Sequence, residues 1–99
     1  MRNTLTAYVI VDIKVNDPVR YEEYKQLAAS AVEQYGGTYI ARGGRTENLE
    51  GGWSPSRLVI LQFESIEQAK TWLHSPEYTR AKQIRHETAV SQMVVVEGL

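Results

Sequence analysis

The 99-residue sequence has a length typical of one domain, since chains divide at roughly 100 to 200 residues per domain. Eleven Lys and Arg against twelve Asp and Glu give a formal charge of -1, which favours neither nucleic acid nor an anionic membrane surface as partner. The absence of cysteine excludes disulfides, thiolate metal ligands and a cysteine nucleophile. We therefore expect one domain over residues 1–99, without nucleic acid or membrane as partner.

Residues 5–15 predict a first strand, because β-branched and aromatic residues alternate between its two faces. Asp17 and Pro18 have the residue types of a helix N-cap and first turn, and Gly36-Gly37 supplies a C-terminal stop. Between these signals, apolar and tyrosine side chains recur at three- and four-residue spacing. The pattern predicts a helix over residues 18–35.

Residues 38–42 predict a second strand, which we expect to continue through residues 45–49 after a kink at Gly43-Gly44. Residues 50–52 would then form the turn. The other interpretation makes residues 43–56 one irregular loop. Loops of that length are uncommon in a compact domain unless they are functional, so we favour the longer strand.

Residues 57–64, entered through Trp53-Ser54-Pro55, are apolar enough to predict a strand in the middle of the sheet. Ser65 has the pattern of a helix cap, and a short helix should follow it. Ser75, followed by proline and glutamate, repeats this signal and predicts a further helical segment. Residues 91–97 predict the last strand.

The order β-α-β-β-α-β, with a divided second crossover helix, is that of the split βαβ or ferredoxin-like α+β fold. Right-handed crossovers place all helices on one face of an antiparallel sheet with strand order 4-1-3-2. Leu58 and Ile60 share one face of the third strand, and Val59 and Leu61 share the other. Both faces of the sheet are therefore apolar, and the helices cover only one of them. A second copy of the chain is the simplest cover for the other face.

Several sequence segments, spread over most of the chain, together form a pattern that is specific enough to indicate a protein family. They are AYVIVDI (7–13), Asp17-Pro18 with Tyr21 and Tyr24, YGGTYIARGG (35–44), Trp53, RLVILQF (57–63), AKTWLHSPEY (69–78) and VVVEG (94–98). From Ala7 to Gly98 the chain thereby resembles the family catalogued as domain of unknown function 1330, in the dimeric α/β-barrel superfamily. This resemblance implies a homodimer whose two sheets face each other as a barrel with the helices outside.

Wider relatives in that superfamily resemble cofactor-independent monooxygenases, lactone isomerases, haem enzymes, and ligand-binding or stress proteins. The fold alone therefore does not choose a function.

Asp12 and His86 are the candidate catalytic residues. An acid in a central strand must be paired or lie in a polar cavity, so Asp12 is either a catalytic carboxylate or half of an ion pair. Arg42, Arg57, Lys14 and Tyr8 are its expected partners. His86 is either a general base or a solvated histidine at a helix end. His74 and His86 lack the spacing of metal ligands, so we expect no metal.

Arg42 and three aromatic residues are the candidate ligand-binding residues. Arg42 precedes two glycines, and its planar guanidinium suits a carboxylate or enolate, although pairing with Glu47 or Glu64 is an equal alternative. Trp53 would be an interface anchor or a pocket lid. Trp72 and Tyr78 could line an aromatic pocket, while the spacing of Trp72 also fits the core.

The leading hypothesis is a dimeric protein that binds a small, partly apolar, anionic molecule between sheet and helices, without a cofactor. The protein would either bind this molecule without changing it or catalyse a monooxygenase- or isomerase-like reaction on it. In the second case Asp12 or His86 would move a proton. The alternative is a non-catalytic dimeric structural or stress-related protein with no small-molecule ligand. Residues 1–6 lack a signal-peptide core and no apolar run spans a membrane, so we expect a cytoplasmic location.

Overall fold

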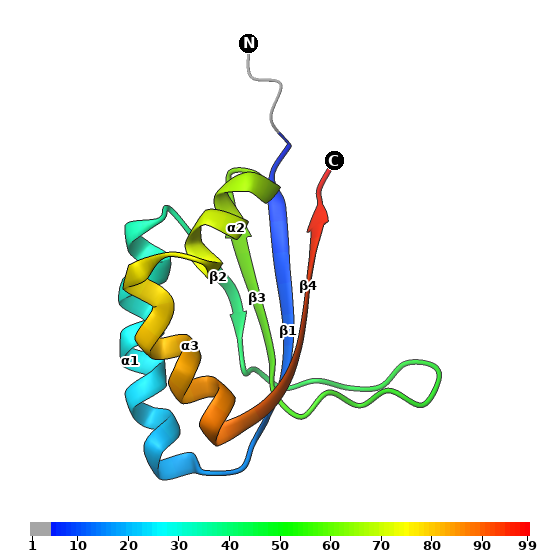
Figure 1. Cartoon of the computed structure of the whole chain (residues 1–99). Coiled ribbons are helices and arrows are strands. Elements are labelled where there is room, and N and C mark those ends of the chain that lie inside the picture. The colour runs from blue at the N-terminus through cyan, green and yellow to red at the C-terminus, as the bar shows by residue number, and fades with distance from the viewer. Residues whose placement is uncertain (1–4) are drawn as a thin grey trace.

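The computed structural model describes residues 5–99, and it consists of a four-stranded sheet with helices packed on one face (Figure 1). Residues 1–4, part of the segment in which we expect no signal peptide, lie outside the described residues. In chain order the elements are β1 (Ala7–Val15), α1 (Pro18–Gln34), β2 (Thr38–Arg42), β3 (Leu58–Phe63), α2 (Ile66–Leu73), α3 (Pro76–Thr88) and β4 (Ala89–Glu97). The antiparallel sheet has the order β2-β3-β1-β4, which confirms the predicted ferredoxin-like topology.

Each helix begins at its predicted cap. Asp17, Ser65 and Ser75 each accept a hydrogen bond from the backbone N–H three residues further on, at 3.2, 3.0 and 3.2 Å. After α1, Gly36 takes the left-handed conformation with φ +74°, which a side chain would disfavour. Side-chain and backbone signals close to each other in sequence therefore place the helix ends.

The hydrophobic core lies between the sheet and the helices. Alternate residues of the strands contribute one side of this core, and residues of the helices contribute the other. The largest fully buried side chains include Ile13, Phe63, Trp72, Tyr78 and Ile84. The aromatic rings stack in series, with ring centroids 5.2 Å apart for Phe63 and Trp72 and 4.5 Å apart for Trp72 and Tyr78. The intervening strand residues face away from the helices and stay partly exposed.

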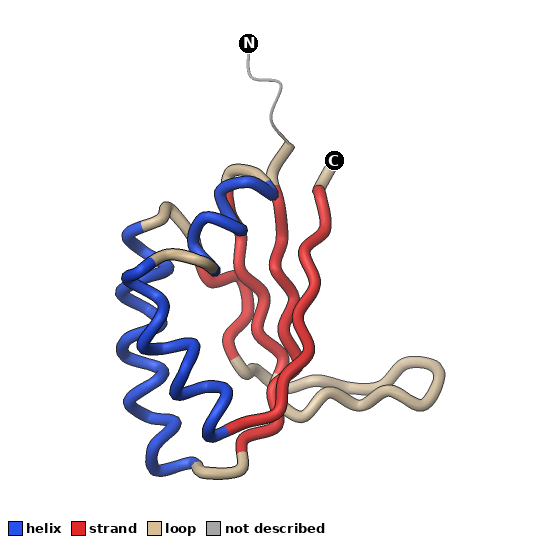
Figure 2. Tube along the Cα trace, viewed as in Figure 1, coloured by secondary structure: helices blue, strands red, loops and turns tan. Residues whose placement is uncertain are grey.

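Residues 43–57 form an irregular arm, so the predicted continuation of the second strand through residues 45–49 is wrong (Figure 2). The arm projects beyond the sheet on the side away from the helices (Figure 1). The register of β2 on β3 shifts between Tyr39 and Ala41, so the irregularity lies before the predicted kink at Gly43. Residues 43–57 form no strand, so this segment is the long irregular loop of the other interpretation.

Candidate functional site

Asp12 lies on the face of the sheet away from the helices, where it holds the base of the arm. Its Oδ2 accepts a hydrogen bond from the indole Nε1–H of Trp53, and its Oδ1 accepts one from the backbone N–H of Ser56, both at 3.0 Å. Two expected partners, Arg42 and Arg57, line a cavity on the helix-covered face instead. Successive strand residues point to opposite faces, so the expected ion pair with either arginine is replaced by hydrogen bonds to the arm.

A groove lies beside β4, between that strand and helices α2 and α3. It consists of two adjoining hollows with volumes of about 390 and 540 Å³, which share Leu73, His74 and Met93. Each hollow has the size of a typical small-molecule site. We name the two hollows together the β4 groove.

The two halves of the β4 groove differ in chemistry. The smaller half is mainly apolar, with Val9, Trp72 and residues 93–95 in its walls, although Lys70 and His74 also line it. The larger half is lined by four basic side chains, which are His74, Lys82, Arg85 and His86. No Asp or Glu within residues 5–99 lines this basic half. The groove therefore presents an apolar wall at one end and positive charge at the other.

Arg85 is a buried cation at the wall of the basic half. Its side chain is 5% exposed, its guanidinium donates a hydrogen bond to Ser91 Oγ, and its Nε has no hydrogen-bond partner. In the part of the chain that the structure describes, no carboxylate lies within ion-pair distance of Arg85. Burial of an unpaired charge is costly, so this position favours an anion in the groove.

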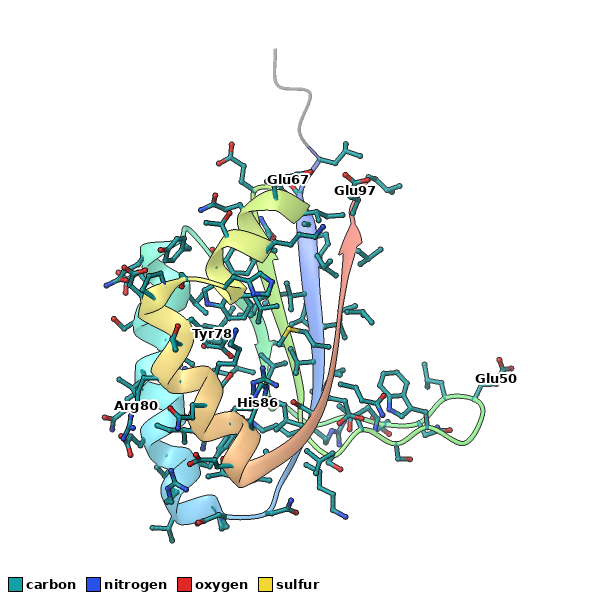
Figure 3. All side chains as sticks on the ribbon, viewed as in Figure 1. Glu50, Glu67, Tyr78, Arg80, His86 and Glu97 are labelled. Carbon is teal, nitrogen blue, oxygen red and sulfur yellow. The ribbon has the colours of Figure 1, made fainter. Side chains whose placement is uncertain are left out.

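His86 lies beside Arg85 in the same half. Figure 3 shows His86 and Tyr78 on the side of α3 that faces the sheet, and Arg80 on the outer side. Burial lowers the pKa of His86, and the charges of Arg85 and Lys82 lower this pKa further. At neutral pH the imidazole is therefore mostly neutral, and it is able to accept a proton.

A smaller cavity of about 20 Å³ lies deeper, between the sheet and α1, and we name it the inner cavity. Its polar walls include Tyr21 and Tyr24 from α1, Tyr39 and Arg42 from β2, and Arg57 from the end of the arm. Trp72 and Met93 border both the inner cavity and the β4 groove, so the two spaces are neighbours.

The tyrosines beside the inner cavity are held in their neutral form. Burial raises the pKa values of Tyr21 and Tyr39, and it raises the pKa of Tyr24 well above its ordinary value. The hydroxyls of Tyr24 and Tyr78 share a hydrogen bond of 2.8 Å. These phenols therefore supply hydrogen bonds and no negative charge at neutral pH.

Three of the six predicted site residues line these two neighbouring spaces, and a fourth, Tyr78, is buried against one of them. Trp72 and His86 line the β4 groove, Arg42 lines the inner cavity, and Tyr78 stacks on Trp72 with no exposed surface. The Arg42 guanidinium donates to the backbone carbonyl of Lys25 at 2.8 Å and lies 4.3 Å from the centre of the Tyr39 ring. The other two, Asp12 and Trp53, meet at the base of the arm, so Trp53 joins no aromatic pocket with Trp72.

Sequence reasoning missed the basic side chains that matter most in these spaces. Arg85 had a usable signal, because it shares the buried face of α3 with Tyr78 and Ala81, so a cation stands in an otherwise apolar stripe. Arg57 had none. Its guanidinium lies where a Cβ at Gly43 would be, and only the tertiary structure shows this approach.

Residues 5–99 show neither a metal-binding cluster nor a membrane-spanning helix. They contain no cluster of three or more His, Cys, Asp or Glu side chains placed to hold a metal ion. None of the helices in this part of the chain is long and apolar enough to cross a membrane.

The fold defines the chain as a ferredoxin-like α+β protein with open and buried spaces between its two layers. The model of the family called domain of unknown function DUF1330 matches residues 6–99, so the chain belongs to this family. No curated protein matches the chain at a significant level.

Several solved structures share the fold. RPA0582 from Rhodopseudomonas palustris, a protein of unknown function, has 16% identity and a TM-score of 0.79, over 98% of this chain and 85% of that one. SnoaB from Streptomyces nogalater, described as a cofactor-independent oxygenase, has 12% identity and a TM-score of 0.70, over 97% and 95%. A protein of unknown function from Bacteroides fragilis, described as dimeric and ferredoxin-like, has 18% identity and a TM-score of 0.64, over 94% and 96%. At these identities the likeness shows the fold alone.

Proposed function

We propose that this protein binds a small, partly apolar carboxylate in the β4 groove. One observation carries the proposal: the groove has an apolar half and, directly beside it, a half lined by four basic groups with no acidic residue of the described chain. An amphipathic anion fits this division, because its apolar part gains from burial beside Trp72 and its charge compensates Arg85. In this arrangement Arg85 and Lys82 hold the anion, a role for which the sequence favoured Arg42.

His86 is the group that we propose to move a proton in the bound ligand. It lines the basic half, and its lowered pKa leaves it able to accept a proton at neutral pH. Asp12 lies on the opposite face and is occupied by the arm, so its bonds favour a structural role. The description of SnoaB as a cofactor-independent oxygenase supports monooxygenase- or isomerase-like chemistry without a cofactor as the activity to test first.

A thermal-shift screen tests the binding step. The panel pairs arylalkanoic and medium-chain carboxylic acids with their uncharged amides, and we expect the acids alone to raise the melting temperature. Lys82→Gln should weaken binding by about two- to fivefold at neutral pH, as expected for loss of a partly exposed charge. Wild-type binding should tighten as the pH falls through the lowered pKa of His86, because the imidazole then gains a positive charge, and His86→Gln should remove this pH dependence.

Arg80→Gln is the matched control, because Arg80 lies on the outer side of the same helix and pairs with Glu23. This variant should bind the acids like the wild type. Equal shifts with acids and amides would contradict an anion site. No shift with any compound would favour the alternative, a dimeric structural or stress-related protein without a small-molecule ligand.

We also propose that a second copy of the chain covers the open face of the sheet. Apolar side chains remain on this face, with Ile40, Val94 and Val96 exposed by 52, 61 and 48%. A contiguous apolar patch on a small domain is a typical interaction surface. The Bacteroides fragilis protein of the same fold is described as dimeric, which supports this arrangement.

A further inference from the structure

Two residues that line the inner cavity have buried hydrogen-bond donors without an acceptor. Arg57 Nε and Trp72 Nε1 are both shielded from solvent, and neither has a hydrogen-bond partner. Both residues line the inner cavity, and Trp72 is only 2% exposed. A buried donor without an acceptor costs free energy, and two at one cavity indicate that an acceptor belongs there.

The charge around the inner cavity is positive and only partly balanced. Lys25, Arg42 and Arg57 line it, whereas no Asp or Glu of residues 5–99 does. Lys25 is paired with Glu22 at 3.0 Å, and Arg42 donates to a backbone carbonyl. Within the same residues, no carboxylate lies within ion-pair distance of Arg57. Neither Arg42 nor Arg57 therefore has a carboxylate partner among these residues, and Arg57 also has a buried Nε without an acceptor.

The neighbouring tyrosines do not supply the missing negative charge. The Arg57 guanidinium lies 5.9 Å from the centre of the Tyr21 ring. Burial raises the pKa values of Tyr21 and Tyr39 although the nearby arginines oppose this, so both phenols stay protonated. A side-chain hydrogen bond joins Arg57 to the Tyr21 hydroxyl, which accepts as a neutral phenol and leaves the charge of Arg57 uncompensated.

The size of the inner cavity limits its occupant. A volume of about 20 Å³ exceeds only slightly what one water-sized particle needs. Donors, unbalanced positive charge and small size together select a compact acceptor that carries negative charge. We propose that the inner cavity binds one small monovalent inorganic anion, such as chloride, between Arg57 Nε–H and Trp72 Nε1–H. This site is separate from the carboxylate site proposed for the β4 groove and does not depend on it.

Nuclear magnetic resonance of the two indole N–H groups tests this site in the intact protein. Trp53→Phe assigns the resonances, because it removes the indole that is bonded to Asp12. Chloride or bromide is titrated against gluconate at constant ionic strength. We expect a saturable shift of the Trp72 resonance and none of the Trp53 resonance, whereas sulfate, which is larger and divalent, should produce no saturable shift.

Two variants locate the anion. Arg57→Gln should weaken chloride binding by about tenfold or more, as expected for loss of a charged hydrogen-bond donor. Lys82→Gln, in the basic half of the β4 groove, should leave the chloride response unchanged. If Arg57→Gln does not fold, Arg57→Lys keeps the charge while removing the Nε–H donor, and its chloride affinity should also fall.

Three results would overturn the proposal. A Trp72 resonance that ignores chloride and bromide would show that the cavity holds no anion. Equal responses to sulfate and chloride would reveal a general salt effect. Loss of the response in Lys82→Gln, with retention in Arg57→Gln, would move the anion to the β4 groove.

Discussion

The two tryptophans show how position decides the energetic role of one residue type. Trp72 is 2% exposed and stacks between Phe63 and Tyr78 at the centre of the core. Trp53 is 59% exposed, and its indole reaches back from the arm to Asp12. Removing the first side chain leaves a cavity in a packed core, whereas removing the second leaves the core intact.

We therefore expect Trp72→Ala to lower the free energy of unfolding by about 3–5 kcal/mol, because it removes a fully buried aromatic side chain. Trp53→Ala should lower this free energy far less. Urea unfolding followed by far-UV circular dichroism measures both variants. An unchanged unfolding midpoint in Trp72→Ala would contradict the packing of α2 on the sheet.

At the scale of elements, the arm is joined to the sheet through hydrogen bonds at its base. Apart from its bonds to Asp12, its polar contacts include a bond from Asn48 Nδ2 to the Trp53 carbonyl at 2.6 Å and an ion pair between Arg45 and Glu47 at 3.1 Å. These contacts lie within the arm itself. Backbone hydrogen bonds of 2.9 Å join the Gly43 N–H to the Leu58 carbonyl and the Ile13 N–H to the Arg57 carbonyl at the two ends of the arm, and the Asp12 carboxylate adds side-chain bonds at its base.

Asp12→Ala should release the base of the arm, because the Trp53 indole and the Ser56 amide both lose their acceptor. Hydrogen exchange followed by mass spectrometry should then become faster across residues 53–57, while exchange in α1 stays unchanged. Lys14→Ala is the control, since Lys14 lies on the same face of β1 and, among residues 5–99, the side-chain hydrogen bonds between β1 and the arm come from Asp12. Unchanged exchange in Asp12→Ala would show that the arm is held by other contacts.

At the scale of the whole molecule, the helices cover only one of the two apolar faces of the sheet. Ile10 and Ile60 are paired across β1 and β3, Ile10 and Val94 are paired across β1 and β4, and all three side chains keep exposed surface. The arm projects on this same side (Figure 1). A second copy that packs sheet against sheet would bury these residues and lie beside the arm.

The wild-type protein should sediment at about twice the 11.2 kDa of one chain at micromolar concentration, because burial of the apolar sheet face drives the association. Val94→Lys should shift the protein towards the monomer, since it places a charge within the proposed interface. Val19→Lys is the matched control, because Val19 is 82% exposed and lies on α1, away from that face. A wild-type monomer, or equal effects of both substitutions, would contradict the sheet-to-sheet dimer.

The sequence by itself determined the order of elements, the helix caps, the strand order and the faces of the strands. These features depend on local signals, as at Asp17, Ser65 and Ser75, and on the two-residue period of β1. Only the tertiary structure decided the path of residues 43–57 and which polar groups meet. The β4 groove forms because β4 returns beside β1 and brings Met93 near Trp72, and the inner cavity is lined by Arg57, whose guanidinium lies over Gly43. These tertiary contacts join residues that are far apart in the chain, so no periodic or capping signal in the sequence can predict them.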